Sequence, residues 1–174
     1  DKIYWYLEDC KRYGTEPFAG LARSGFIAVE LLNSMVNKKI IEKNEKDLFF
    51  KNLKSITTEI LKDKNLSKKI FCKKYGHLRP STYDILSKNY KENYYTFFKK
   101  NKSKHSTINE IPKFQFSKKS KIKIKKFLKL LNSNLTLNKF IDFLKKGIQY
   151  REYSKFIFTK SIDLIFDEIK FLSK

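Results

Sequence analysis

Glycine and proline are scarce in this chain, which has only 5 and 3 of them among 174 residues. A β-sandwich or β-barrel needs a turn about every 8–12 residues, and glycine and proline supply many such turns, so these folds are excluded. Cysteine is rarer still, because Cys10 and Cys72 are the only two and they fit no metal-binding spacing. Without a disulfide framework, a reducing cytoplasm is the expected compartment.

Long apolar runs are also missing. A membrane-spanning helix needs roughly 20 consecutive apolar residues, and the longest candidate, Phe26–Met35, is interrupted by Glu30 and Asn33. We therefore expect no membrane partner. There is no signal peptide, and the first residue is Asp1 rather than methionine, so we expect a fragment of a longer, multidomain protein.

The sequence motifs of several enzyme classes are absent as well. There is no glycine-rich phosphate loop, no HExxH motif and no nucleophile elbow. His77 and His105 are the only histidines, which excludes a multi-histidine metal site. We therefore expect neither a metal nor a cofactor in this chain.

What the chain does contain is ample apolar and aromatic surface. Its hydrophobic content of 41% and aromatic content of 16% are too high for intrinsic disorder, although 33% of the residues are charged. A domain of this size can bury roughly 70% of its unfolded surface. We therefore expect a single domain over residues 1–174.

Positive charge is also abundant, with a formal net charge of +21 at pH 7. Such a charge favours nucleic acid as a partner. Only four of the 39 lysine and arginine residues are arginine, however, and arginine is the residue whose planar fork best reads phosphates and bases. The excess of lysine, with abundant asparagine and isoleucine, is typical of a genome-wide compositional drift. We therefore do not expect nucleic acid as the partner.

Lysine is missing from three stretches of this lysine-rich chain, which we call the first, second and third lysine-free segments. They hold all four arginines, all five glycines and two of the three prolines. Where lysine is the default cation, a retained arginine indicates a need for a planar, permanently charged group. We therefore expect the function to lie in these segments, which are residues 12–37, 75–87 and 147–154.

Hydrophobic periodicity predicts helices throughout and no strand. Gly14 is expected to stop the first helix, and Thr15 to cap the second. Ser81 and Asp84 have the spacing of a capping box for a helix after Pro80. The expected fold is all-α, an irregular multi-helix bundle with a long C-terminal helix. The other predicted helices span residues 3–12, 17–36, 46–61, 67–75 and 122–131, and the long C-terminal helix spans residues 137–169 after a cap at Thr136.

A lysine-, serine- and asparagine-rich stretch around Pro112 has the composition of a loop. We predict a flexible surface loop over residues 99–120, within a low-complexity region that extends to residue 126.

The first lysine-free segment offers Tyr13, Thr15, Glu16 and Arg23 as candidate binding residues. Gly20 lies one turn before Arg23 and leaves open space beside its guanidinium group. Glycine inside a helix costs about 1 kcal/mol relative to alanine, so it is tolerated where a backbone or a ligand comes close. Arg23 could equally pair with a carboxylate in the core.

The second lysine-free segment places five polar side chains on a loop stiffened by Pro80. Such a loop can bind a ligand with little loss of entropy. His77 could be a base, an anion donor or a core histidine, and the other polar groups could simply satisfy helix ends. The second-segment candidates are His77, Arg79, Thr82, Tyr83 and Asp84.

In the third lysine-free segment Arg151 is a candidate binding residue, with a salt bridge inside the protein as the alternative.

Three motifs together resemble the middle region of phosphoenolpyruvate-synthase-like phosphotransferases, a family that includes rifampin phosphotransferase and L-glutamine kinase. The motifs are YGTEPFAGLAR at 13–23, YGHLRPSTYDILS at 75–87 and REYSKFIFTK at 151–160. The resemblance covers residues 4–170 with the family's order and spacing. It is closest to the L-glutamine kinases that begin the synthesis of capsular phosphoramidate. Position 81 is serine here, where the family often has glycine, so the turn can differ.

In that family an ATP-grasp domain phosphorylates a histidine on a swivelling domain, which then visits the acceptor. The resemblance implies that this chain holds the acceptor, and that ATP and magnesium bind to other domains of the same polypeptide. The family's carrier histidine lies in a Thr-Ser-His motif that is absent here, so His77 is not the carrier. The isolated chain is therefore expected to be inactive.

L-Glutamine is the expected acceptor, and it needs partners for a carboxylate, an ammonium group and an amide. Arg23 and Arg79 are candidates for the carboxylate or a phosphoryl group, and Glu16 or Asp84 for the ammonium. His77, the one candidate catalytic residue, could orient the amide or stabilise the incoming phosphoryl group, together with hydroxyl groups. These hydroxyl groups are those of Tyr13, Thr15 and Tyr83.

Two alternatives to an L-glutamine site stay open. The chain could bind a different small-molecule acceptor, or it could be a non-enzymatic basic module that binds nucleic acid or an acidic partner.

Overall fold

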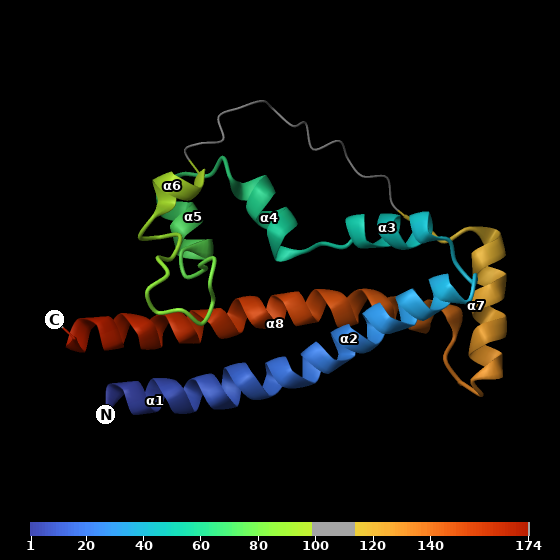
Figure 1. Cartoon of the computed structure of the whole chain (residues 1–174), viewed down its shortest axis with the longest axis horizontal. Coiled ribbons are helices and arrows are strands. Elements are labelled where there is room, and N and C mark those ends of the chain that lie inside the picture. Colours follow the sequence, from blue (N-terminus) through green and yellow to red (C-terminus); the bar gives the residue numbers. More distant parts are fainter. Residues whose placement is uncertain (99–113, 174) are drawn as a thin grey trace. The chain divides into compact units, whose positions relative to one another are not determined.

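The computed structural model describes residues 1–98 and 114–173, and all regular structure in those ranges is helical, which confirms the all-α prediction. The long C-terminal helix is also present, as α8 with 36 residues. None of the described helices is both long and apolar enough to cross a membrane. The elements are α1 (Lys2–Asp9), the π-helix η1 (Cys10–Thr15), α2 (Glu16–Asn37), α3 (Lys43–Lys51), α4 (Ile56–Asp63), α5 (Lys68–Tyr75), α6 (Tyr94–Phe98), α7 (Lys118–Leu130) and α8 (Leu137–Leu172) (Figure 1).

The described chain forms two compact units. Unit 1 consists of residues 1–20, 55–98 and 152–173, and unit 2 of residues 21–54 and 114–151. The boundaries between the units fall inside α2 and α8, so each of these helices contributes residues to both units.

Unit 2 has the larger hydrophobic core. Ala28, Leu32 and Met35 of α2 recur at helical spacing and are fully buried, as the apolar stripe in the sequence predicts. Phe140 and Leu144 line the corresponding face of α8. The same cluster includes Ile41, Phe49, Leu53, Phe116, Ile124, Leu128 and Ile148.

Unit 1 has two smaller clusters, and both include residues of α8. One joins Cys10 of η1 to Phe158 and Ile165. The other joins Phe71 and Tyr75 of α5 to Phe156 of α8, and it is rich in aromatic contacts. The two clusters place residues 156–158 of α8 at the centre of this unit.

The predicted stop at Gly14 and cap at Thr15 are wrong. The backbone stays helical from α1 through η1 into α2 (Figure 1), and no described glycine has a positive φ. The Thr15 hydroxyl donates to the Cys10 carbonyl at 3.3 Å instead of capping a helix. A Cβ on Gly14 would lie 2.9 Å from Cδ2 of Phe158, so this glycine serves close packing and not a left-handed turn.

The predicted helix over residues 46–61 is two helices. α3 ends at Lys51, and α4 begins at Ile56 after Ser55, whose hydroxyl accepts from the backbone N–H of Thr58 at 3.2 Å. Asn52 lies at the break, where its side chain donates to the Leu48 carbonyl at 3.1 Å. Polar side chains that bond to nearby backbone compete with helix continuation, which explains the break.

The predicted helix after Pro80 is also wrong. Residues 81–93 form turns, and the next helix is α6, beginning at Tyr94. Asp84 does not act as a helix cap, because its carboxylate accepts from the backbone N–H of Leu86 at 2.9 Å. This short bond two residues along the chain stabilises a turn in place of a helix.

The predicted loop over residues 99–120 differs from the structure at its C-terminal end, and residues 99–113 lie outside the described residues. Phe116 is buried, and α7 begins at Lys118. Ser117 caps this helix, accepting from the backbone N–H of Ser120 at 3.1 Å, and Ser120 in turn donates to Glu45 at 2.7 Å. The predicted cap of α8 is confirmed, since Thr136 accepts from the backbone N–H of Lys139 at 3.3 Å.

Candidate functional site

The first and second lysine-free segments meet on one turn of α8 in unit 1. The ring of Phe158 stacks on Phe18 at 5.6 Å between centroids and lies 6.3 Å from the ring of Tyr83. Two positions earlier on α8, the ring of Phe156 contacts the ring of His77 at 4.7 Å between centroids. Segments far apart in sequence are therefore held together by the aromatic side chains of residues 156–158.

A cavity of about 380 Å³ lies beside this turn, and all its lining residues belong to unit 1. Its volume is within the range of small-molecule sites. We call it the unit 1 cavity. Its walls are the side chains of Ile56, Ile60, Leu78, Pro80, Tyr90 and Phe156, and its polar groups are those of Thr57, Arg79, Thr82, Glu152, Lys155 and Thr159.

Arg79 lines the unit 1 cavity, but its guanidinium group is already used by the protein. The side chain is only 2% exposed and forms an ion pair with Asp163. It also donates to the Ser87 carbonyl at 3.2 Å and lies 4.9 Å from the ring of Phe166. This geometry is that of a structural ion pair, and it differs from the ligand-facing fork that the sequence suggests.

His77 is half-buried and uses one ring nitrogen within the protein. Its Nε2 lies 3.1 Å from the carbonyl oxygen of Phe156. Burial lowers the pKa of His77 to about 4, so the ring is neutral at pH 7 and Nε2–H donates to that carbonyl. Of the three roles open to this residue, the structure favours the core histidine that satisfies a backbone group.

The other candidates of the second segment divide between the cavity and the surface. Thr82 lines the unit 1 cavity. Tyr83 is exposed apart from its contact with Phe158, and the Asp84 carboxylate is used by its own turn. Thr82 is therefore the one residue of these three that can meet a ligand in the cavity.

The candidates of the first segment lie outside the unit 1 cavity. Tyr13 is 73% exposed, and Thr15 and Glu16 are also exposed. Arg23 is exposed on the part of α2 that belongs to unit 2.

Arg151 belongs to unit 2, where it packs against α2. Its guanidinium carbon lies 4.6 Å from the ring centroid of Phe26. A Cβ on Gly25 would lie 2.7 Å from Cδ of Arg151, and one on Gly147 would lie 3.0 Å from the Ser24 carbonyl oxygen. These two glycines therefore serve close helix packing, and Arg151 covers the contact.

The sequence reasoning missed Thr57, Glu152, Lys155 and Thr159. Glu152, Lys155 and Thr159 recur at intervals of three and four residues, so they share one face of α8. That spacing, next to the buried Phe156, is the signal that could have found them. Thr57 has no comparable signal, because it follows the cap of α4 within lysine-rich sequence.

The free polar groups of the unit 1 cavity are one carboxylate, one ammonium group and two hydroxyls. Within the described part of the chain, the side chains of Glu152, Lys155, Thr57 and Thr82 have no hydrogen bond or ion pair to the protein. Thr159 is used locally, since its hydroxyl donates to the Phe156 carbonyl at 2.9 Å. No group of three or more histidine, cysteine or acidic side chains among the described residues could hold a metal ion.

Comparison of the chain with protein families, with curated proteins and with solved structures found no match. We therefore infer the class of ligand from the side chains that line the unit 1 cavity. Opposite charges on one helix face, together with free hydroxyls and apolar walls in the same cavity, suit a small zwitterion that carries a polar side chain.

Proposed function

We propose that this chain binds the acceptor substrate of an ATP-dependent phosphotransferase, with L-glutamine as the acceptor. The observation that carries the proposal is the pair of unpartnered charges, Glu152 and Lys155, on the face of α8 that lines the unit 1 cavity. The resemblance of residues 13–23, 75–87 and 151–160 to phosphoenolpyruvate-synthase-like phosphotransferases supports the reaction class.

Each free polar group of the cavity has a partner on L-glutamine. Its ammonium group pairs with the Glu152 carboxylate, and its α-carboxylate with the Lys155 ammonium group. The hydroxyls of Thr57 and Thr82 can donate to and accept from the side-chain amide. The methylene groups then lie against apolar walls such as Phe156.

Arg79 contributes to this site by positioning the loop. Its ion pair with Asp163 ties the loop before Thr82 to α8, and its bond to the Ser87 carbonyl ties the turn that follows. Thr82 is thereby held in the wall of the unit 1 cavity, which the charged face of α8 also lines. A preformed site loses little entropy when the ligand binds.

The phosphoryl group comes from elsewhere in this proposal. ATP and magnesium bind to a separate ATP-grasp domain, and a phosphohistidine domain brings the phosphoryl group to the acceptor, as the resemblance implies. His77 donates to the Phe156 carbonyl through Nε2, which suits a positioning role better than that of a carrier. The isolated chain is therefore expected to bind L-glutamine without turning it over.

Isothermal titration of the 174-residue chain with a panel of amino acids tests the proposal. We expect saturable binding of L-glutamine that changes little with salt. Glu152→Gln and Lys155→Gln each remove one charged partner, worth about 1.5–3 kcal/mol, and should weaken binding about 10- to 100-fold. Glu30→Gln and Lys139→Gln, exposed positions on α2 and α8, are the matched controls and should bind as the parent does.

Three results would overturn the proposal. The first is that no amino acid of the panel binds, and the second is that the control variants weaken binding as much as the cavity variants do. The third is binding of nucleic acid with an affinity that falls steeply with salt, since the release of counterions produces that dependence.

A further inference from the structure

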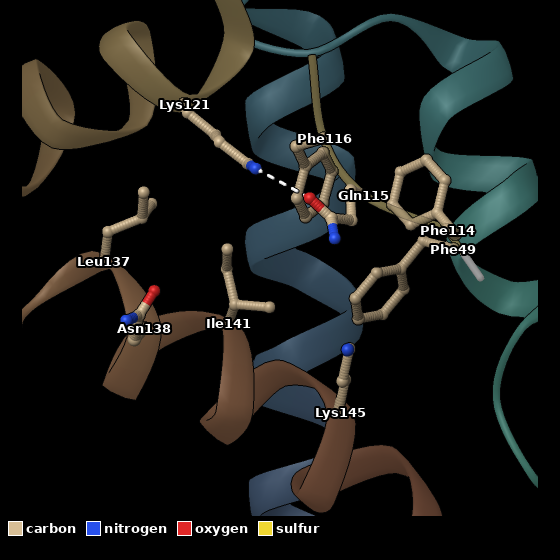
Figure 2. A pocket seen from close by; sticks show the side chains of 9 residues that line it. All are labelled: Phe49, Phe114, Gln115, Phe116, Lys121, Leu137, Asn138, Ile141 and Lys145. Carbon is tan, nitrogen blue, oxygen red and sulfur yellow. Dashed lines mark hydrogen bonds between the residues drawn. The ribbon is translucent and has the colours of Figure 1, made fainter. Parts of the chain in front are cut away.

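Unit 2 contains a second cavity, of about 310 Å³, which we call the unit 2 cavity. Its lining residues come from α3, from the extended residues 114–116, from α7 and from α8 (Figure 2). Nothing in the proposed acceptor site involves these residues. The volume is that of a small-molecule site and is too small for a protein segment.

One wall of the unit 2 cavity is aromatic. Phe49 and Phe116 are 1% and 3% exposed, and their rings stack 5.7 Å apart at an interplanar angle of 24°. The half-buried Phe114 meets both rings edge-on, at 6.1 and 5.0 Å. The backbone N–H of Phe114 donates to the side chain of Asn52 at 2.9 Å, so this wall is fixed before any ligand binds.

The opposite wall comes from α8 and is aliphatic. Leu137 and Ile141 lie one turn apart on the helix, and both are partly buried against the core of unit 2. A flat apolar group placed between this wall and the ring of Phe114 would be covered on two sides.

The polar groups of the unit 2 cavity carry positive charge and no negative charge. Two lysines and two amides line it, and none of the lining residues that the structure describes is acidic. Lys121 donates to the side-chain oxygen of Gln115 at 3.2 Å, whereas Lys145 has no hydrogen bond or ion pair within the described part of the chain. Figure 2 shows both amino groups directed toward the aromatic wall, Lys121 from α7 and Lys145 from α8. Besides these two lysines and Gln115, the remaining polar side chain that lines the cavity is that of Asn138.

We propose that the unit 2 cavity binds a small organic anion that carries an aromatic ring. The ring packs between Phe114 and the aliphatic wall, and a carboxylate or phosphate group pairs with Lys121 and Lys145. The amides of Gln115 and Asn138 donate further hydrogen bonds to the anion. Because no lining residue that the structure describes is an anion, an ammonium group would find only amide oxygens as partners, and the site discriminates against zwitterions such as L-glutamine.

Isothermal titration with four probes tests the ligand class. 3-Phenylpropionate and phenyl phosphate carry both the ring and the charge, 3-phenyl-1-propanol carries the ring alone, and acetate carries the charge alone. We expect one molecule of each aromatic anion to bind, with the alcohol at least about tenfold weaker because it forfeits the charged hydrogen bonds. The ratio between the two anions tells which head group the site prefers.

Substitutions of residues that line the cavity, compared with control substitutions on α7 and α8, locate the site. Lys121→Gln and Lys145→Gln should each weaken binding of 3-phenylpropionate about tenfold, and Phe114→Leu should weaken it while keeping the wall apolar. Lys126→Gln and Lys139→Gln change exposed lysines of α7 and α8 outside the cavity and should leave the affinity unchanged. Excess L-glutamine should not compete, whether or not it binds in unit 1.

Three results would overturn this second site. They are equal affinity for 3-phenylpropionate and the neutral alcohol, equal weakening by the control and cavity lysine variants, and no saturable binding of either aromatic anion to the parent chain.

Discussion

Arg79 is held by several groups of unit 1 at once. Its guanidinium pairs with Asp163, which also accepts from Asn89 at 3.0 Å, and it donates to the Ser87 carbonyl at 3.2 Å. A lysine at this position would keep the charge but lose the planar fork that reaches two partners at once. The loop before Thr82 therefore depends on arginine in particular.

Replacing Arg79 tests this role. We expect Arg79→Lys to lower the free energy of unfolding by about 1–3 kcal/mol through lost charged hydrogen bonds. Arg79→Met should cost more, about 3–5 kcal/mol, because it leaves the Asp163 carboxylate buried without its cation. Urea denaturation followed by circular dichroism measures both.

Arg23→Lys, an exposed change on α2, is the control and should shift stability by no more than about 0.5 kcal/mol. Parent-like stability of Arg79→Lys with much weaker L-glutamine binding would instead make Arg79 a ligand group.

His77 links stability to pH in a defined direction. Burial lowers its pKa in the folded chain from the usual 6.5 to about 4, so between these values the unfolded chain binds a proton that the folded chain does not. The folded state should therefore lose stability as pH falls from 6.5 toward 4. Denaturation midpoints of the parent and of His77→Gln across this range measure the effect.

We expect the difference in stability between the parent and His77→Gln to shrink as the pH falls, because only the parent loses the contribution of a neutral His77. His105 is present in both proteins and cancels in the comparison. A difference that stays constant from pH 7 to about 4 would show that burial of His77 has no such cost.

At the level of single elements, the glycines of α2 separate into two kinds. A Cβ on Gly20 would meet nothing within 4 Å, whereas a Cβ on Gly25 would lie 2.7 Å from Cδ of Arg151 and 3.0 Å from the backbone oxygen of Gly147. We expect Gly20→Ala to raise the thermal midpoint, since alanine favours a helix by about 1 kcal/mol. Gly25→Ala should lower it, because the backbone of α8 cannot yield as a side chain can.

Differential scanning calorimetry of the two variants measures this contrast, and each serves as the control for the other. Equal stabilisation by both would mean that the close approach at Gly25 does not constrain α2.

The elements also show which features the sequence could predict. One helix with strong local signals is found where expected, since α5 begins after Ser67 and ends just before Gly76. The signals at Thr15 and Pro17 do not mark the start of a separate helix, because the backbone stays helical from η1 into α2. The break at Asn52 was missed because it depends on a polar contact, from the Asn52 side chain to the Leu48 carbonyl. No periodicity in residues 46–61 encodes that contact.

The site was predicted less well than the helices, for a related reason. The lysine-free segments include Thr82, which lines the unit 1 cavity, and Arg79, but they give no sign of the protein groups that already use Arg79. Whether an arginine faces a ligand or a carboxylate depends on residues such as Asp163, which is 84 positions away. The charges of Glu152 and Lys155 were overlooked because charged residues on a helix are usually solvated.

On the scale of the whole chain, the net charge of +21 is a property of composition more than of any one site. Some of the lysines pair with acids, as Lys74 does with Asp63 at 2.8 Å, but lysine and arginine outnumber aspartate and glutamate by 39 to 18. Self-repulsion among unpaired positive charges favours expanded states over the folded chain.

Added salt should therefore stabilise this protein, in contrast to a fold held together by surface ion pairs. Screening at about 0.5 M sodium chloride shortens the Debye length to a few ångströms, which weakens repulsion between lysines that do not touch. Close pairs such as Lys74 with Asp63 lose less, since they contribute at most about 1 kcal/mol to begin with. We expect the thermal midpoint to rise steadily with sodium chloride, as measured by circular dichroism. A chain in which Lys118, Lys125 and Lys126 of α7 are changed to glutamine carries less charge and should show a smaller rise. A midpoint that falls with salt would instead mean that the ion pairs outweigh the repulsion, and that the lysines contribute to the stability of the fold.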